Sequence, residues 1–163
     1  MNIKDMLMVG MADLKAASNP GVLTTLGLGS CVGIALYDAH AKVAGLAHCM
    51  LPDSTQIQNN GNIAKFVDTA VIRLINDMTR LGARKEFLKA KIAGGAQMFA
   101  FNTTNESMRI GDRNVAAATK LLSELRIPII GKDTGSDYGR TVELYAEDGR
   151  FLIKTIGHGI KTI

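Results

Sequence analysis

The chain has 163 residues, of which 47% are hydrophobic and 21% charged, so its composition is that of an ordinary globular protein and argues against global disorder. The formal net charge of +4 and the pI of about 9.2 are mildly basic, but the lysines and arginines are scattered, and there are only three Tyr, five Phe and no Trp. A nucleic-acid partner is therefore disfavoured, and the basic surface is either an ordinary solvated surface or a docking site for an acidic protein.

The hydrophobic stretches are too short to span a membrane, so we expect no membrane insertion. The N-terminal segment is interrupted by Lys4, Asp5 and Asp13 and does not have the form of a signal peptide. We therefore expect a cytoplasmic protein that forms one domain over residues 1–163, with Cys31 and Cys49 as reduced thiols.

The first third of the chain is rich in short apolar segments that predict strands. Three of them are Val22–Leu28, Val32–Tyr37 and Val43–His48, separated by turn-forming residues. A further strand is expected within Met8–Ala16, and the polar segment Asp53–Gly61 is expected to be a loop.

Two segments have the apolar periodicity of helices. The first covers residues 63–81 and is ended by Gly82, and the second runs from about Asp112, as its N-cap, to Arg126. Between them, Lys89–Ala93 predicts a short strand that ends at Gly94-Gly95.

The last third again predicts strands, at 129–130, 141–146 and 151–155, the last two joined by a turn at 147–149. The order of strands, helix, strand, helix and strands predicts an α+β fold, with two main helices covering a β-sheet core. It disfavours a doubly wound nucleotide-binding fold, because the glycine-rich segment 27–33 is followed by a strand and not by a helix.

Cys31 is a candidate nucleophile because it follows a glycine-rich turn between two predicted strands. Gly29 and Ser30 permit a tight turn that presents the thiol and directs backbone N–H groups, such as that of Cys31, toward a developing oxyanion. Considered alone, the segment favours the alternative, a cysteine that is a small buried hydrophobic residue.

His48 is the candidate base for this thiol. If the strands at 32–37 and 43–48 form a hairpin, its imidazole lies beside Cys31, where it can accept the thiol proton. Thr25 could orient the imidazole by accepting from its distal nitrogen, whereas Thr24 would face the other side of the strand. A structural histidine and an ordinary strand threonine are the alternatives.

The remaining candidates are less specific. Cys49 is expected in the core, because adjacent strand residues face opposite sides, and the three histidines have no metal-ligand spacing. Gly94, Gly95, Gly139 and Arg140 are candidates for substrate or partner binding. Gly94 and Gly95 could let a peptide backbone approach closely, although a tight turn is the simpler interpretation, and Gly139 and Arg140 mark a loop that could line a cleft. The N-terminus of the second helix could hold an anion, although capping by Asp112 is the simpler interpretation.

Taken together, these segments resemble the chemoreceptor glutamine deamidase family, CheD, over nearly the whole chain. The motifs are, in chain order, Thr25-Leu26-Gly27-Leu28-Gly29-Ser30-Cys31-Val32, Ala47-His48 with Met50-Leu51-Pro52, Lys65-Phe66-Val67-Asp68, Lys91-Ile92-Ala93-Gly94-Gly95-Ala96, Ile110-Gly111 with Arg113-Asn114, and Gly139-Arg140. Each motif alone is weak, but the ordered set is highly specific.

The resemblance implies a catalytic set of Cys31, His48 and Thr25 in an α/β sandwich related to bacterial toxin deamidases. It implies methyl-accepting chemoreceptors as substrates and a CheC-type phosphatase as a binding partner. The implied mechanism, through a cysteine thioester, needs no cofactor and no metal. The chain departs from the family pattern at Cys49 and at Ser136, and the second departure bears on recognition by the loop before Gly139.

Three functions remain open at this point. The chain is expected to be a cysteine-dependent protein-glutamine glutaminase, which could also hydrolyse receptor glutamate methyl esters. Alternatively, it is mainly a non-catalytic adaptor that regulates a chemotaxis phosphatase, or a thiol amidase of the transglutaminase type.

Overall fold

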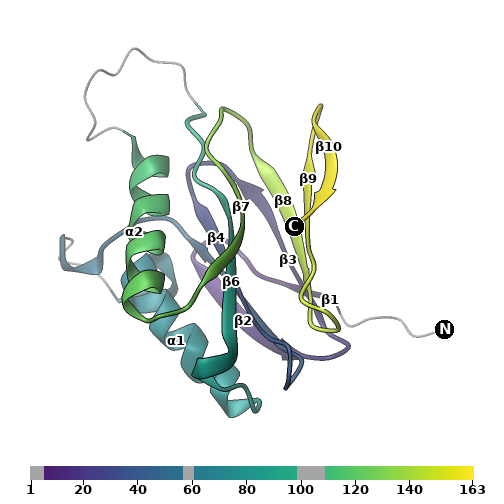
Figure 1. Ribbon diagram of the computed structural model, residues 1–163. Helices are drawn as coiled ribbons and strands as arrows, with labels where there is room; N and C mark the ends of the chain where they lie inside the picture. The colour runs from purple at the N-terminus through teal and green to yellow at the C-terminus, as the bar shows by residue number, and fades with distance from the viewer. Residues whose placement is uncertain (1–5, 57–60, 99–108) are drawn as a thin grey trace.

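A computed structural model describes residues 6–56, 61–98 and 109–163. Figure 1 shows three layers, in which two helices cover one face of a five-stranded sheet and a second five-stranded sheet covers its other face. We call the sheet between the helices and the other sheet the inner sheet, and the remaining one the outer sheet. Among the described helices, none is long and apolar enough to cross a membrane.

The two sheets take their strands from both halves of the chain. The inner sheet has the order β2 (Asp13–Ser18), β5 (Val43–Cys49), β4 (Val32–Asp38), β6 (Leu88–Gly94) and β7 (Ile129–Thr134). The outer sheet has the order β1 (Met6–Met8), β3 (Val22–Leu28), β8 (Arg140–Tyr145), β9 (Phe151–Thr155) and β10 (Gly159–Thr162).

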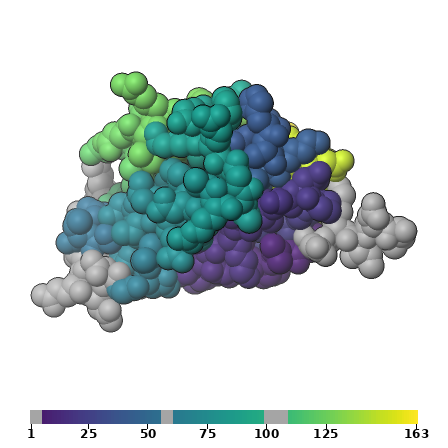
Figure 2. All heavy atoms as spheres, turned by 90° about the horizontal axis from the view of Figure 1, so that it is seen from below, coloured from purple at the N-terminus to yellow at the C-terminus, as the bar shows by residue number. Residues whose placement is uncertain are grey.

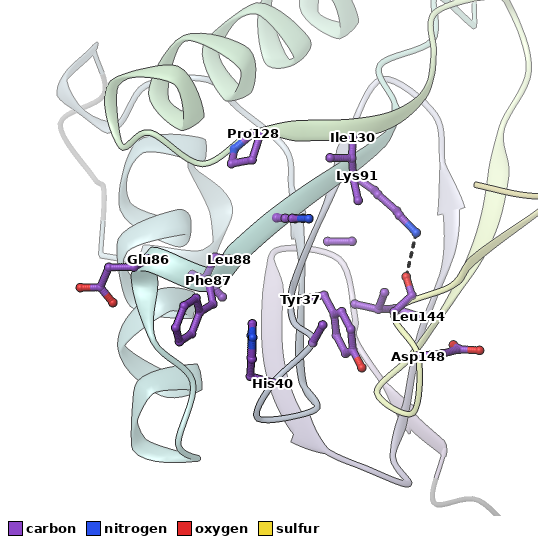
Figure 3. Close-up of a pocket in the computed structure, with 14 residues that line it drawn as sticks. Tyr37, His40, Glu86, Phe87, Leu88, Lys91, Pro128, Ile130, Leu144 and Asp148 are labelled. Carbon is purple, nitrogen blue, oxygen red and sulfur yellow. Dashed lines mark hydrogen bonds between the residues drawn. The ribbon is translucent and has the colours of Figure 1, made fainter.

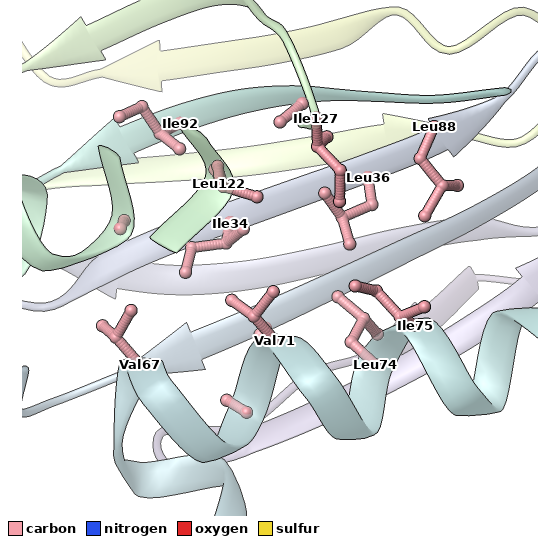
Figure 4. Packing of buried hydrophobic residues seen from close by; sticks show 14 of the residues in the cluster. Ile34, Leu36, Val67, Val71, Leu74, Ile75, Leu88, Ile92, Leu122 and Ile127 are labelled. Atoms are coloured by element: carbon pink, nitrogen blue, oxygen red, sulfur yellow. The ribbon is translucent and has the colours of Figure 1, made fainter. Parts of the chain in front are cut away.

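Helices α1 (Val67–Arg80) and α2 (Ile110–Glu124) pack on the inner sheet. In Figure 4, Val67, Val71 and Leu74 of α1 point toward Ile34 and Leu36 of β4. A separate apolar cluster fills the space between the two sheets. Strand β4 is therefore covered on both faces, which is why its sequence is a continuous apolar run and not an alternating one.

The predicted α+β class is confirmed, and several boundaries need correction. Asp112 is not the N-cap of α2, because the helix begins two residues earlier, after Arg109, and the Asp112 carboxylate instead lies 3.8 Å from the Arg109 guanidinium. The first helix begins at Val67, because residues 63–65 form a separate 3-10 turn. The segment Met8–Ala16 contains a turn at Met11-Ala12 and belongs to two strands of different sheets.

Two edge strands of the outer sheet, β1 and β10, were not predicted. The segment Asp53–Gly61 was expected to be a loop. Its residues Ser54–Gln56 form a 3-10 turn, and residues 57–60 lie outside the described residues. The turn at 147–149 is confirmed, with the Gly149 amide donating to the Tyr145 carbonyl.

The turn between β4 and β5 is held by the buried carboxylate of Asp38. It accepts hydrogen bonds from the backbone amides of His40, Ala41 and Arg84 at 2.8, 3.0 and 2.9 Å. Figure 2 shows this turn, in blue, against the teal segment that follows α1. The carboxylate thus ties the far end of the central hairpin to the helix layer.

We expect Asp38→Ala to lower the free energy of unfolding by about 3 kcal/mol, because it removes the acceptor of three partly buried backbone hydrogen bonds. Burial opposes ionisation of Asp38, but the amides outweigh it and lower its pKa. The stabilisation is therefore present above the unfolded-state pKa of about 3.9 and is lost as the pH falls through the lower folded-state pKa.

Urea denaturation at neutral and acid pH measures this effect. Asp77→Ala is the matched control, because Asp77 pairs with exposed arginines on α1 and should contribute at most about 1 kcal/mol. Equal losses in the two variants would contradict the role given to Asp38.

Candidate active site

Cys31 and His48 lie on the same face of the inner sheet, at one end of the β4–β5 hairpin. His48 pairs with Gly33, two residues after Cys31, so the alternation of side chains places both on the face toward the outer sheet. The predicted hairpin is present, but His48 does not lie directly opposite Cys31. It lies opposite Gly33, two residues further along the chain. Neighbouring strands hold His48 rigidly, since it also pairs with Asp13 of β2.

Thr25 approaches His48 from the outer sheet, across the sandwich. Its Oγ1 lies 2.7 Å from His48 Nδ1 and 2.6 Å from the backbone oxygen of Val9, and all three groups are buried. The single hydroxyl hydrogen must be donated to the Val9 carbonyl, which cannot itself donate. Thr25 Oγ1 therefore accepts from His48 Nδ1–H, and this fixes the neutral imidazole with its lone pair on Nε2.

His48 Nε2 is buried and has no hydrogen-bond partner among the described residues. Burial lowers the pKa of His48, which keeps the imidazole neutral at physiological pH. An unpartnered basic nitrogen on the face that also carries the Cys31 thiol has the chemistry of a proton acceptor.

The Cys31 thiol is only 8% exposed. Burial raises its pKa, and the Cys31 backbone amide, which donates to the same sulfur, partly offsets the increase. Both pKa shifts therefore favour the uncharged forms, a thiol and a neutral imidazole.

The turn before Cys31 depends on a bulge at the end of β3. The pairing of β3 with β8 shifts between Thr25 and Leu28, and Gly27 adopts a φ of 66°. Leu26 is exposed as a result, while Gly29 packs so closely on Met98 that an added Cβ would lie 3.2 Å from Met98 Cγ. Two exposed apolar side chains therefore lie close to the turn that carries the thiol. Leu26 is close in the sequence, and Met98 is close in space.

Gly94 and Gly95 are buried behind Cys31, and the backbone that approaches Gly94 closely is the chain's own. A Cβ on Gly94 would lie 2.4 Å from the Cys31 carbonyl oxygen, and Gly94 has a φ of 99°. The Gly95 amide donates to that same oxygen at 2.8 Å. These glycines support the turn that carries Cys31 from inside the fold.

Arg140 is also buried, with no exposed side-chain area. Its guanidinium donates to the carbonyls of Gly135 and Tyr138 and pairs with Asp133. A side chain in this position cannot touch a docked partner directly, so we revise its role to holding the loop that ends at Gly139. The half-buried Gly139 remains near the site, since its Cβ position lies 3.9 Å from Met98 Cε.

Asn114 contacts the site and was missed as a functional candidate. Its side-chain amide donates to the carbonyls of Ser30 and Met50 at 3.0 and 2.9 Å. The only available signal was its place in the motif after Ile110-Gly111, and nothing local to α2 indicates that its side chain reaches the nucleophile turn.

The other sequence candidates lie elsewhere. Cys49 is fully buried on the helix side of the inner sheet, and the Thr24 hydroxyl donates to the Val142 carbonyl. His40 and His158 are exposed, and the described residues contain no cluster of metal-ligating side chains.

A cavity of about 370 Å³ lies at the opposite end of β4, between the hairpin turn, β6 and the turn at 147–149 (Figure 3). Its lining is mostly apolar and includes Tyr37, Phe87 and Leu144. The Lys91 amine at its edge is bonded to the carbonyls of Gly149 and Ile163. None of the candidate catalytic residues lines this cavity.

Comparison with known proteins connects this chain to chemotaxis. The family model CheD, described as chemotactic sensory transduction, matches residues 50–155. A probable chemoreceptor glutamine deamidase CheD of Caldanaerobacter subterraneus subsp. tengcongensis is 57% identical over 157 residues, covering 96% of this chain and 97% of the relative. The chemoreceptor glutamine deamidase CheD of Halalkalibacterium halodurans is 49% identical over 162 residues, covering 99% of this chain and all of the relative.

Proposed function

The chain belongs to the CheD family, and from this premise we propose that it converts glutamine side chains of chemoreceptors to glutamate, with Cys31 as nucleophile, His48 as general base and acid, and Thr25 as the residue that orients His48. The observation that carries the proposal is the free Nε2 of His48, held toward the thiol face by the Thr25 hydrogen bond to Nδ1. The names of the relatives supply the substrate class.

The first half of the reaction forms a thioester. As Cys31 Sγ bonds to the side-chain amide carbon, its proton passes to His48 Nε2, and the carbonyl oxygen becomes an oxyanion near the Cys31 backbone amide. Protonated His48 then donates to the amide nitrogen, the C–N bond breaks, and ammonia leaves.

The second half is the hydrolysis of that thioester. Neutral His48 accepts a proton from water as the water oxygen bonds to the acyl carbon. The C–S bond then breaks to release glutamate, and protonated His48 returns its proton to the sulfur, which restores the thiol and the neutral imidazole. A glutamate methyl ester presents a similar carbonyl with a better leaving group, so receptor methylesterase activity is included in the proposal.

Further parts of the proposal rest on the family resemblance. They are a cytoplasmic location, a CheC-type phosphatase as partner and a fold relationship to bacterial toxin deamidases. The alternative is a mainly non-catalytic adaptor, which would act by binding and regulating the phosphatase. It requires no turnover at Cys31.

Mass spectrometry of a chemoreceptor fragment incubated with the protein tests the proposed function. We expect conversion of specific glutamines to glutamate. Absence of conversion together with tight binding of a phosphatase would favour the adaptor. Incorporation of an added primary amine in place of water would indicate a transglutaminase-type enzyme.

The pH dependence of kcat/KM is expected to show an acid limb with a midpoint below 6.5, the ordinary value for histidine. Only neutral His48 can accept the thiol proton, and burial lowers its pKa, so activity persists below the ordinary value and is lost as the pH falls through the lowered one. Rates on a receptor fragment across the acid range measure this. A midpoint above 6.5 would contradict the assignment.

Thr25→Val keeps the shape of the side chain and removes the acceptor for His48 Nδ1–H. We expect kcat to fall roughly tenfold to a hundredfold, because the imidazole loses its fixed tautomer and orientation. Thr24→Val is the matched control, since its hydroxyl bonds only the β8 backbone in the described contacts. Equal effects of the two substitutions on kcat would argue against the positioning role of Thr25.

A further inference from the structure

Asn114 is a fully buried polar residue on the helix layer whose side chain spans two functional segments. Its Nδ2 group donates both hydrogens, one to the Ser30 carbonyl at 3.0 Å and one to the Met50 carbonyl at 2.9 Å. Its Oδ1 has no partner among the described residues. The two carbonyl acceptors fix the orientation of the amide, because a flipped side chain would place Oδ1 against both of them.

The close approach of α2 to the nucleophile turn makes this reach possible. Gly111, in the first turn of α2, lies so near the end of β6 that an added Cβ would be 2.6 Å from the carbonyl oxygens of Gly95 and Ala96. Asn114 lies three residues later, on the same side of the helix as Gly111. The helix is thus seated where an asparagine can bond the backbone before Cys31.

The bond to Ser30 bears directly on the oxyanion site. The Ser30 carbonyl and the Cys31 N–H belong to one planar peptide and point in opposite directions. Fixing the carbonyl toward Asn114 therefore fixes the N–H on the other side, and that N–H lowers the pKa of the Cys31 thiol. The second bond holds Met50, two residues after His48, so the same amide also fixes the end of β5.

We propose that Asn114 is a positioning residue for the reaction, which orients the Ser30–Cys31 peptide so that the Cys31 N–H faces the sulfur and the oxyanion, and which ties this peptide to the strand end that carries His48. The inference rests on the proposed function for its catalytic meaning. Its consequence for the thiol itself does not require turnover.

Two measurements on Asn114→Ala test the proposal. We expect kcat for receptor glutamine conversion to fall on the order of tenfold to a hundredfold while KM changes by less than about threefold, since a transition-state contact is loosened and substrate contacts are not. We also expect the pH midpoint for iodoacetamide alkylation of Cys31, followed by peptide mass mapping, to move upward. The reason is that the Cys31 backbone amide, which lowers the pKa of the thiol, would no longer be held in a fixed orientation.

Leu122→Ala is the matched control, because Leu122 is equally buried on α2 and packs in the apolar cluster between helices and sheet. It should lower stability and leave kcat and the alkylation midpoint unchanged. Asn114→Asp, which keeps the shape but cannot donate when ionised, is measured in parallel, so that a folding failure of the alanine variant does not end the test.

Wild-type kcat and an unmoved alkylation midpoint in either folded Asn114 variant would overturn the proposal, as would equal shifts in Leu122→Ala. If the wild-type protein converts no glutamine, the proposed function fails, and the alkylation comparison still decides the positioning role.

Discussion

Replacing Cys31 with alanine is expected to reduce glutamine conversion to the uncatalysed background, a loss of at least about 10⁴-fold in kcat. Without the sulfur, no thioester forms, and the neighbouring imidazole has no nucleophile to deprotonate except water. The fold should persist, because Cys31 lies at the end of a hairpin and the substitution removes only one heavy atom. Conversion is measured by mass spectrometry of a receptor fragment, with circular dichroism to verify folding.

Cys49→Ala provides the matched control for a thiol. Cys49 is fully buried on the opposite face of the inner sheet, so its loss affects packing and not the site. We expect activity close to wild type with a modest decrease in stability. Persistent conversion by Cys31→Ala, or complete loss in a folded Cys49→Ala protein, would contradict the assignment of the nucleophile.

Replacing His48 with alanine is expected to lower kcat at neutral pH by roughly 10³-fold, because general-base assistance is lost. Cys31 then remains a thiol, since burial raises its pKa. Raising the pH ionises the thiol directly, so the residual activity of His48→Ala should rise with pH, whereas the wild-type rate should reach its plateau once His48 is neutral.

Rates measured from acid to alkaline pH separate these two profiles. His40→Ala is a suitable control, because His40 is an exposed histidine in the turn at the far end of the same hairpin. A His48→Ala protein with the wild-type pH profile and rate would remove His48 from the mechanism.

The geometry around Cys31 was only partly predictable from the sequence. Strand alternation and the short distance between the two segments predict the hairpin and place Cys31 and His48 on one face, because both are local properties. Alternation also separates Thr25 from Thr24. It does not reveal that Thr25 belongs to a different sheet, since that depends on pairing with β8, more than a hundred residues away.

The contacts that support the Cys31 turn could not be predicted from the sequence either, because they also join segments that are far apart in the chain. Arg140 looks like a surface loop residue, but Asp133 and two loop carbonyls compensate its burial. Asn114 looks like an ordinary helix residue, and its reach to Ser30 follows from how closely α2 packs at Gly111. The edge strands β1 and β10 are exposed along their length and therefore lack an apolar alternation.

The central claim is that Cys31 forms a covalent bond to the side chain of the substrate glutamine. Rapid acid quenching of the wild-type protein during turnover of a receptor fragment, followed by peptide mass mapping, tests this most directly. We predict an acyl adduct on the peptide that contains Cys31, which disappears on treatment with hydroxylamine, as a thioester should. An adduct on Cys49 or on any other residue, or unchanged conversion by the Cys31→Ala protein, would contradict the account.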